Sequence, residues 1–109
     1  MIKYKIEIYL PEDFVEKMID ELTQIGACKI GNYDHVASYY KTGGCWRPLP
    51  GSTPYEGEVG KLCRSEEFKL EIRCEEQFVK QVVDKIIEIH PYDEVVYNII
   101  KLENYNFEN

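Results

Sequence analysis

Histidine and cysteine are the residues of this chain whose side chains most directly suggest chemistry. The sequence contains two histidines, His35 and His90, and four cysteines, of which Cys45 lies in a Gly/Pro-rich stretch. Thiolate and imidazole together suit zinc or copper. No CxxC or HxxxH spacing is present, so a site from His35, Cys45 and His90, with Cys28 as a weaker candidate, would have to be assembled by the fold or between subunits. We expect no resident metal and no cofactor.

The same residues do not indicate an enzyme. Cys45 with His35 or His90 would supply a nucleophile and a base, but no third group that orients the base is identifiable. Asp93 and Glu94 are adjacent, and adjacent residues of a strand point to opposite faces, so they do not form an acid/base pair. We therefore expect a protein without catalytic activity of its own.

A stretch over 57–61 contains the glycines and lysine of a phosphate-binding loop but lacks its other positions. A Walker A motif needs a glycine five residues before its Gly-Lys pair, where this chain has Tyr55. It also needs a Ser or Thr after the lysine, where this chain has Leu62. We interpret the stretch as a turn that leads into a strand.

Trp46 and Arg47 are the stronger recognition residues. Trp and Arg are enriched at interface hot spots, and here they lie in a long loop expected over about 41–57. Loops of this length are uncommon in a compact domain unless they are functional. We expect the pair to contact a second subunit, with a small-molecule cleft as the alternative.

His90, Cys63 and Cys74 have simpler structural interpretations. His90 falls at the last turn of a predicted helix, where an imidazole can interact with the helix C-terminus and bond a loop carbonyl, with ligand binding as the alternative. Cys63 and Cys74 are expected to be buried as small hydrophobic residues. The chain shows no secretory signal and is not cysteine-dense, so we expect reduced thiols and a cytoplasmic location.

Composition narrows the class of protein. The 109 residues suffice for one domain, and the apolar fraction of 44% is ordinary for a globular protein. The net charge of −7 and the absence of a Lys/Arg cluster in the sequence argue against nucleic acid as a partner. Apolar runs are only a few residues long, so we expect no membrane partner either.

Hydrophobic periodicity predicts two strand–helix–strand units. The first has a strand over 2–10, a helix from 11–13 to Gly26, and an irregular strand over about 28–40 with a bend near Gly31. The second has a strand that ends at Cys74, a helix from 75–76 to His90, and a strand over about 95–102.

The order β-α-β-β-α-β predicts an α+β fold, the ferredoxin-like split βαβ sandwich. Right-handed crossovers place both helices on one face of a four-stranded antiparallel sheet. The strand over 2–10 and the one ending at Cys74 are expected at its centre, with charged side chains paired across their outer faces. The domain is expected over 1–103, with a polar tail over 104–109. A second copy would cover the bare face through Tyr9, Tyr39 or Tyr40, and Tyr97.

Three ordered motifs carry a resemblance to a known group of proteins. They are Gly26-Ala27-Cys28-Lys29-Ile30-Gly31-Asn32-Tyr33, the loop from Trp46-Arg47-Pro48 to Gly60-Lys61, and His90-Pro91-Tyr92-Asp93-Glu94. Over about residues 1–103, the chain resembles the domain inserted in bacterial NIF3-like proteins of the YqfO type. That domain is similar in fold to the PII and CutA proteins. The chain departs from the pattern at Cys28, where the family usually has Gly, and in lacking the NIF3 body.

The resemblance implies a standalone PII/CutA-like domain that acts as a homo-oligomer and binds a small molecule or divalent ion in a regulatory role. A trimer is suggested by those relatives, with a dimer as the alternative. The di-metal activity of the NIF3 body does not carry over, because its ligands lie outside the insert. Two other functions stay open, a protein-interaction or assembly module without a ligand, and a metal-binding protein with His and Cys ligands at a subunit junction. The candidate ligand or interface residues are Tyr33, His35, Cys45, Trp46, Arg47, Tyr55, His90 and Tyr92.

Overall fold

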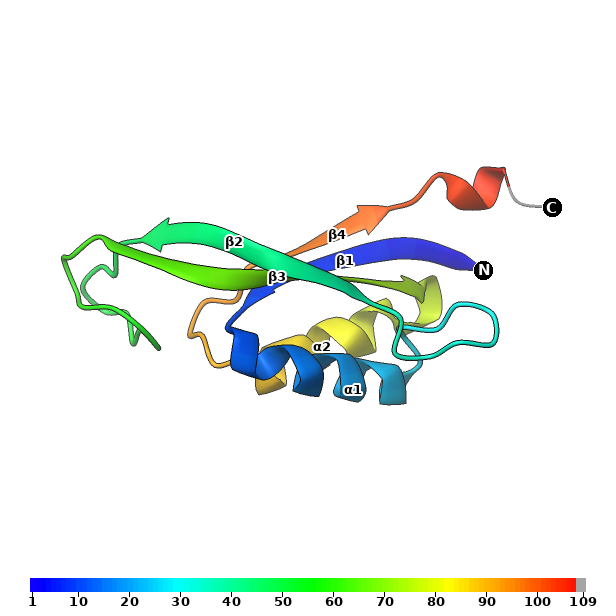
Figure 1. The fold of residues 1–109 in the computed structure, drawn as a ribbon, viewed down its shortest axis with the longest axis horizontal. Helices are drawn as coiled ribbons and strands as arrows, with labels where there is room; N and C mark the ends of the chain where they lie inside the picture. The colour runs from blue at the N-terminus through cyan, green and yellow to red at the C-terminus, as the bar shows by residue number, and fades with distance from the viewer. Residues whose placement is uncertain (108–109) are drawn as a thin grey trace.

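The computed structural model describes residues 1–107 and confirms the expected fold class (Figure 1). One antiparallel sheet contains four strands in the order β2-β3-β1-β4, with bounds β1 (Ile2–Leu10), β2 (Ser38–Trp46), β3 (Cys63–Glu75) and β4 (Tyr97–Lys101). The helices are α1 (Val15–Ile25) and α2 (Val79–Ile89), and each follows a short 3-10 turn, η1 (Glu12–Phe14) or η2 (Glu76–Phe78). None of the helices in this described part is long and apolar enough to cross a membrane.

The predicted polar tail begins with an ordered turn. A third 3-10 turn, η3, covers Asn104–Asn106 just after β4. Residues 108–109 of the predicted tail lie outside the described residues, and the boundary at 103 stays a prediction.

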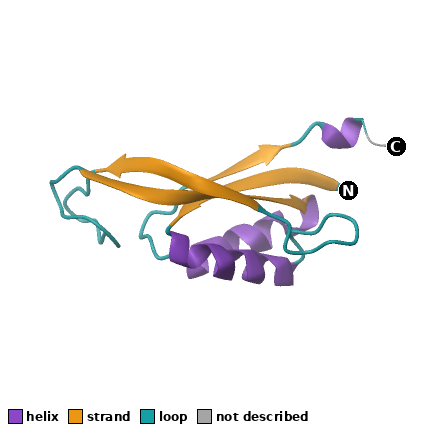
Figure 2. Ribbon diagram, viewed as in Figure 1, coloured by secondary structure: helices purple, strands orange, loops and turns teal. Residues whose placement is uncertain are grey.

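Both helices lie on one side of the sheet (Figure 2). The core lies between them and the inner faces of the central strands. The alternation of β1 and β3 is confirmed, because their buried side chains face the helices. These side chains are Ile6, Ile8 and Leu10 of β1 and Leu70, Ile72 and Cys74 of β3. They pack against Val15, Met18 and Leu22 of α1 and Val82 and Ile86 of α2. Full burial of each large aliphatic side chain contributes roughly 1.5–3 kcal/mol, so these two layers hold the fold together.

Gly26 ends α1 for two independent reasons. Its φ of +125° lies in a region that L side chains rarely adopt, and its N–H bonds back to the carbonyls of the last turn. A Cβ at this position would stand 2.8 Å from the Phe78 ring. The glycine therefore allows the chain to turn sharply while η2 packs closely against it.

We predict that Gly26→Ala destabilises the protein by more than about 2 kcal/mol, because backbone strain and a steric clash add together. Gly31→Ala is the matched control, since Gly31 also has a positive φ, of +56°, but a Cβ there would meet no atom within 4 Å. The control should lose only about 1 kcal/mol. Urea unfolding of both variants measures the difference, and equal losses would refute the role of the Phe78 contact.

The predicted second strand is wrong in its bounds. Residues 28–37 form a loop with one small bridge between Ile30 and Tyr33, and β2 begins only at Ser38. The expected loop over 41–57 is also wrong at its start, because residues 41–46 pair with 63–68 of β3. Gly43 and Gly44 suggested a turn, but pairing with β3 overrides their weak strand preference. The true loop between these strands covers residues 47–62.

The outer face of the sheet carries a ladder of paired charges, as expected for the central strands. Glu7 Oε2 lies 3.3 Å from both Lys5 Nζ and Lys69 Nζ, and both lysines also contact Glu71. Asn98 Nδ2 donates to Glu7 Oε1 at 3.2 Å. Burial by itself would raise the pKa of Glu7, but the hydrogen bonds from Asn98 and the two lysines hold it below its usual value.

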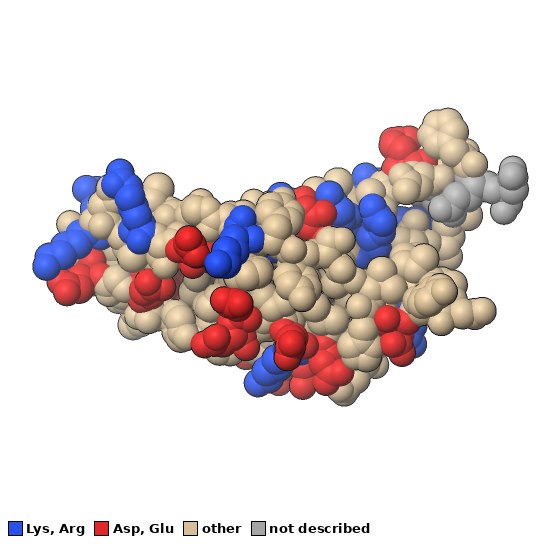
Figure 3. Space-filling model, in the orientation of Figure 1, with Lys and Arg blue, Asp and Glu red and all other residues tan. Residues whose placement is uncertain are grey.

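Four tyrosines were expected on this outer face, but the strand register places them on both faces of the sheet. Tyr9 pairs with Lys69, and Tyr40 donates to Glu71, so both lie on the outer face. Tyr39 and Tyr97 pair with Leu70 and Ile8, which places them on the helix face, and their expected position was wrong. Figure 3 shows acidic side chains gathered along the helix side of the molecule, and basic ones over the sheet side and hairpin tip.

We predict that Glu7→Gln lowers the free energy of unfolding by about 1–2 kcal/mol at pH 7, because two lysines lose their shared carboxylate. Glu66→Gln is the control. The Glu66 side chain is 75% exposed and its ion pair with Lys41 is long at 3.8 Å, so the change should alter stability by under about 0.5 kcal/mol. A carboxyl with a lowered folded pKa stabilises above its unfolded pKa. The Glu7→Gln effect should therefore shrink as pH falls below the ordinary glutamate pKa and be lost as pH passes through the lower pKa of folded Glu7. Chemical denaturation at several pH values measures it, and a loss that does not decline as the solution is acidified would contradict this assignment.

Candidate functional site

The β2–β3 hairpin projects beyond the helices (Figure 1). Its end lines a cleft of about 860 Å³. Three segments enclose it, namely the end of the hairpin, the loop 47–62, and the connection 90–96 between α2 and β4. Tyr9, at the end of β1, completes the lining. The volume falls within the range of small-molecule sites, so the cleft is the candidate functional site.

The loop 47–62 is fixed to the hairpin through Trp46. The indole Nε1–H of Trp46 donates to the Glu56 carbonyl at 3.1 Å. Gly57 lies against the same indole with a φ of +105°, and a Cβ there would stand 3.5 Å from Nε1. The Gly60 N–H donates to the Pro48 carbonyl at 2.8 Å and closes the base of the loop. The Gly/Pro pattern of this loop therefore encodes a specific backbone path.

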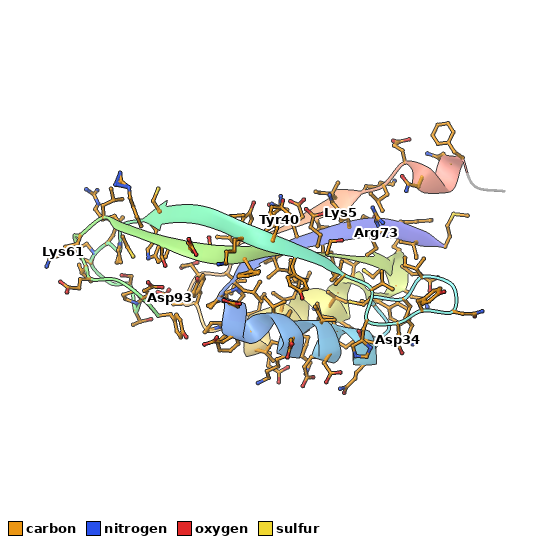
Figure 4. The ribbon with its side chains drawn as sticks, in the orientation of Figure 1. Lys5, Asp34, Tyr40, Lys61, Arg73 and Asp93 are labelled. Atoms are coloured by element: carbon orange, nitrogen blue, oxygen red, sulfur yellow. The ribbon has the colours of Figure 1, made fainter. Side chains whose placement is uncertain are left out.

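A second set of bonds joins the loop to the α2–β4 connection. The Thr53 N–H donates to Asp93 Oδ2 at 2.9 Å, and the Glu94 N–H donates to Asp93 Oδ1 at 3.1 Å. The Thr53 backbone bond is the main cause that lowers the pKa of Asp93, against the opposing effect of burial. Figure 4 shows Asp93 beneath the hairpin, facing the loop. Asp93 thus latches two segments that are far apart in sequence.

Tyr92 forms the inner wall of the cleft. Its ring centroid is 5.8 Å from that of Tyr55 and 4.7 Å from that of His90. Its hydroxyl donates to Glu67 Oε2 at 3.2 Å. Burial raises the pKa of Tyr92, and the negative charge of Glu67 raises it further, so the phenol stays protonated. Tyr55 in turn meets the Phe14 ring edge-on at 6.4 Å.

His90 lies directly behind this wall and has a structural arrangement. Its Nε2–H donates to the Tyr9 carbonyl at 2.6 Å, and its Nδ1 accepts from the Tyr92 N–H at 3.2 Å. Both ring nitrogens are therefore satisfied by a neutral imidazole. Burial lowers the pKa of His90, although the bond to Tyr9 opposes the shift. His90 directly follows α2, but the carbonyl that its ring bonds belongs to β1 and not to a loop as expected, and the ring is not part of the cleft lining.

His35 and Tyr33 lie elsewhere in the fold. His35 bonds to Asp20 Oδ1 at 2.9 Å and to Asp34 Oδ1 at 2.8 Å. The bond to Asp20 is the largest cause of a raised imidazole pKa, and the bond to Asp34 adds to it. Figure 4 places Asp34 at the end of the molecule opposite the cleft. Tyr33 is 76% exposed in the same 28–37 loop.

The cleft therefore unites five of the eight candidate residues. They are Cys45, Trp46, Arg47, Tyr55 and Tyr92. Sequence reasoning missed Tyr9 and Glu67, which were interpreted as outer-face strand residues, and the latching role of Asp93. Their only sequence signal is polar or aromatic character at the end of a strand or next to a turn, which is too common to select them.

The cysteines are all free thiols. Cys74 is buried as expected and Cys28 is buried too, and burial raises the pKa of each thiol to about 11. Cys63 is only partly buried, and Cys45 is exposed at the cleft. Within residues 1–107, no group of three or more His, Cys, Asp or Glu side chains is placed to hold a metal ion.

The architecture defines a class of protein, the CutA-like α+β domain. The chain superimposes on the periplasmic divalent cation tolerance protein CutA from Archaeoglobus fulgidus with a TM-score of 0.68, 16% identity, and coverage of 94% of this chain and 85% of that one. A PII-like protein CutA from Nostoc gives a TM-score of 0.67 with 17% identity, covering 95% of this chain and 84% of that one. At such identities these likenesses show a shared fold alone.

Sequence comparison shows which proteins are homologous to this chain. A Bacillus subtilis protein named GTP cyclohydrolase 1 type 2 homolog is 36% identical over 99 residues, which cover 91% of this chain and 26% of that protein. A Bacillus cereus protein related to NIF3 gives a TM-score of 0.80 with 28% identity, covering 94% of this chain and 26% of that one. No protein-family model matches the chain. The chain is thus homologous to one segment of NIF3-related proteins, and it spans about a quarter of the length of these relatives.

We predict that the two histidines titrate on opposite sides of the ordinary value of about 6.5, with His35 above it and His90 below it. The His35 contacts therefore stabilise at low pH and weaken as pH rises through the folded pKa. The His90 contacts stabilise above 6.5 and are lost as pH falls. Proton NMR of the imidazole signals measures both, and Asp20→Asn, the control, should move His35 alone. A shared pKa near 6.5 would show that these contacts do not form in solution.

Proposed function

We propose that this domain is a non-enzymatic binding module that captures a small molecule in the cleft and acts in regulation as a homo-oligomer. The observation that carries the proposal is the cleft itself, in which recognition residues from three separate segments converge. Aromatic and Arg side chains of this kind dominate binding energy where they are fixed in place. Here Trp46 is hydrogen-bonded to the loop, and Tyr92 is held by Glu67 and by its packing on His90.

The chemistry of the cleft supports binding rather than catalysis. The curated relatives carry a name that refers to GTP cyclohydrolase, but this chain spans only a quarter of their length. Neither histidine lines the cleft, so the exposed thiol of Cys45 has no imidazole base beside it. Glu67 accepts a hydrogen bond from the Tyr92 hydroxyl, and Asp93 accepts one from the Thr53 N–H. These bonds hold the segments that line the cleft in place, a role that differs from proton transfer.

Self-association is the second part of the proposal. Both α1 and α2 lie on the inner face of the sheet (Figure 1), and on the outer face Tyr40 remains 48% exposed. Among the described residues, the edge strands β2 and β4 each have one neighbouring strand, so a second copy can pair with an outer edge of the sheet. We propose a trimer, by analogy with the CutA-like fold, with a dimer as the alternative.

Two other functions remain as alternatives. A protein-interaction or assembly module would use the bare sheet face and the edge strands without any ligand in the cleft. A metal-binding protein would need ligands from two chains at a subunit junction, because residues 1–107 of one chain offer no such cluster.

The single tryptophan of the chain, Trp46, lines the cleft and provides a specific optical reporter. We predict that members of a panel of small organic cations, anions and neutral aromatics change its fluorescence. Tyr55→Ala should weaken the strongest binder about tenfold, because it removes an aromatic wall worth about 1 kcal/mol or more. Tyr33→Ala, which removes another exposed tyrosine, one outside the cleft, should leave the affinity unchanged.

Failure of every compound to change the Trp46 signal would oppose a small-molecule role. Equal losses in the Tyr55 and Tyr33 variants would show that binding occurs outside the cleft. A protein that co-purifies stoichiometrically while the cleft stays unresponsive would favour the interaction module.

A further inference from the structure

We propose that the guest of this cleft is a small organic cation, an amine or guanidinium on an apolar body, and that Glu67 receives its charge. The inference rests on the proposed function, because it assigns a chemical class to the ligand of the same site. It follows from three separate properties of the lining, which are its charge, the surroundings of one carboxylate, and the orientation of its aromatic rings.

The charge of the lining favours a cation. Among the described residues that line the cleft, Arg47 is the one basic side chain, against four acids, Glu56, Glu67, Asp93 and Glu94. Arg47 is exposed, so it lies where water screens it most. Lys61 belongs to the same loop but pairs with Glu58 at 2.8 Å and does not line the cleft. An anion such as a nucleotide would therefore enter against the net charge, whereas a cation would be attracted.

Glu67 is the acid best placed to meet that cation. Asp93 is occupied by the latch to Thr53 and by the Glu94 N–H. The Glu67 carboxylate is partly buried and accepts one hydrogen bond, from the Tyr92 hydroxyl to Oε2. Its Oε1 lies over Gly44, 3.0 Å from where a Cβ would stand, so no side chain at that position covers it. A carboxylate can accept about four hydrogen bonds, which leaves Glu67 with capacity for an ammonium or guanidinium group.

The aromatic lining suits the same class of guest. Tyr9, Trp46, Tyr55 and Tyr92 all contribute to the cleft. The rings of Tyr55 and Tyr92 are inclined at 47° with centroids 5.8 Å apart, and they form a corner next to the Glu67 carboxylate. The faces of such rings attract cations, and their area covers an apolar body. After burial, the charges of Glu67 and Glu56 are further causes of the raised pKa of Tyr92, which indicates a negative potential at this corner.

Four probes with related bodies test the charge preference. Three of them share a phenyl group and differ in charge, namely phenethylamine (a cation), 2-phenylethanol (neutral) and 3-phenylpropionate (an anion). The fourth, N-acetyl-arginine amide, represents a cationic side chain of a protein. Binding to the whole protein is followed by Trp46 fluorescence and by calorimetry. We expect phenethylamine to bind at least about tenfold more tightly than 3-phenylpropionate, with the preference reduced by salt. Tighter binding of the arginine amide than of phenethylamine would indicate a protein side chain as the natural cation, and the reverse order a free amine.

Charge-neutral variants test the role of Glu67. Glu67→Gln keeps an oxygen for the Tyr92 hydroxyl, and we expect it to weaken phenethylamine about tenfold while 2-phenylethanol changes by less than about twofold. Glu58→Gln, in the loop 47–62 and outside the lining, is the control and should change neither. Glu56→Gln offers a second test at an exposed position, and we expect it to weaken phenethylamine binding about threefold. Circular dichroism confirms that each variant is folded.

The outcomes separate this inference from the proposed function. Equal or tighter binding of 3-phenylpropionate would overturn the cation assignment, and an unchanged amine affinity in Glu67→Gln would overturn the role of Glu67. Either result would leave the cleft as a ligand site. Failure of all four probes at about 10 mM, a concentration that detects affinities near −3 kcal/mol, would count against both proposals.

Discussion

The pairing of β2 with β3 continues past the ends of both helices, and the candidate site exists because of that excess length. No residue of 41–46 or 63–67 is buried, so this part of the hairpin has no core beneath it. Backbone hydrogen bonds alone do not stabilise an isolated two-stranded ribbon in water. The loop 47–62 must therefore fold back and find contacts on the body of the domain, and the space left between loop and hairpin becomes the cleft.

Two hydrogen bonds hold the folded-back loop in a defined position beside the cleft. Trp46 anchors the loop to the hairpin through its indole, and Asp93 anchors it to the connection between α2 and β4. The connection is itself fixed from behind, because the neutral ring of His90 joins the end of β1 to the Tyr92 backbone. Stability of the packed core is thus transmitted to the cleft through a short chain of hydrogen bonds. Residues that bind can consequently be ordered before the ligand arrives, which lowers the entropic cost of binding.

The sequence was informative where local chemistry decides the structure. Strict alternation located β1 and the second half of β3, and Gly26 with Pro91 located the helix ends. It failed for residues 41–46 of β2, because Gly43 and Gly44 have a weak strand preference and residues 63–67 lack apolar alternation. Only long-range pairing reveals that segment as a strand. The turn-rich segments supplied Trp46, Tyr55 and Tyr92, whereas Glu67 and Tyr9 join the cleft solely through the register and twist of the sheet.

Native mass spectrometry of the untagged protein as purified tests the central claim most directly, because one spectrum gives both the subunit number and any retained mass. We expect a homo-oligomer, with a small mass bound to each subunit that is released when the protein is denatured. A bare monomer, or an assembly whose added mass is another protein, would contradict a ligand-binding role for the cleft.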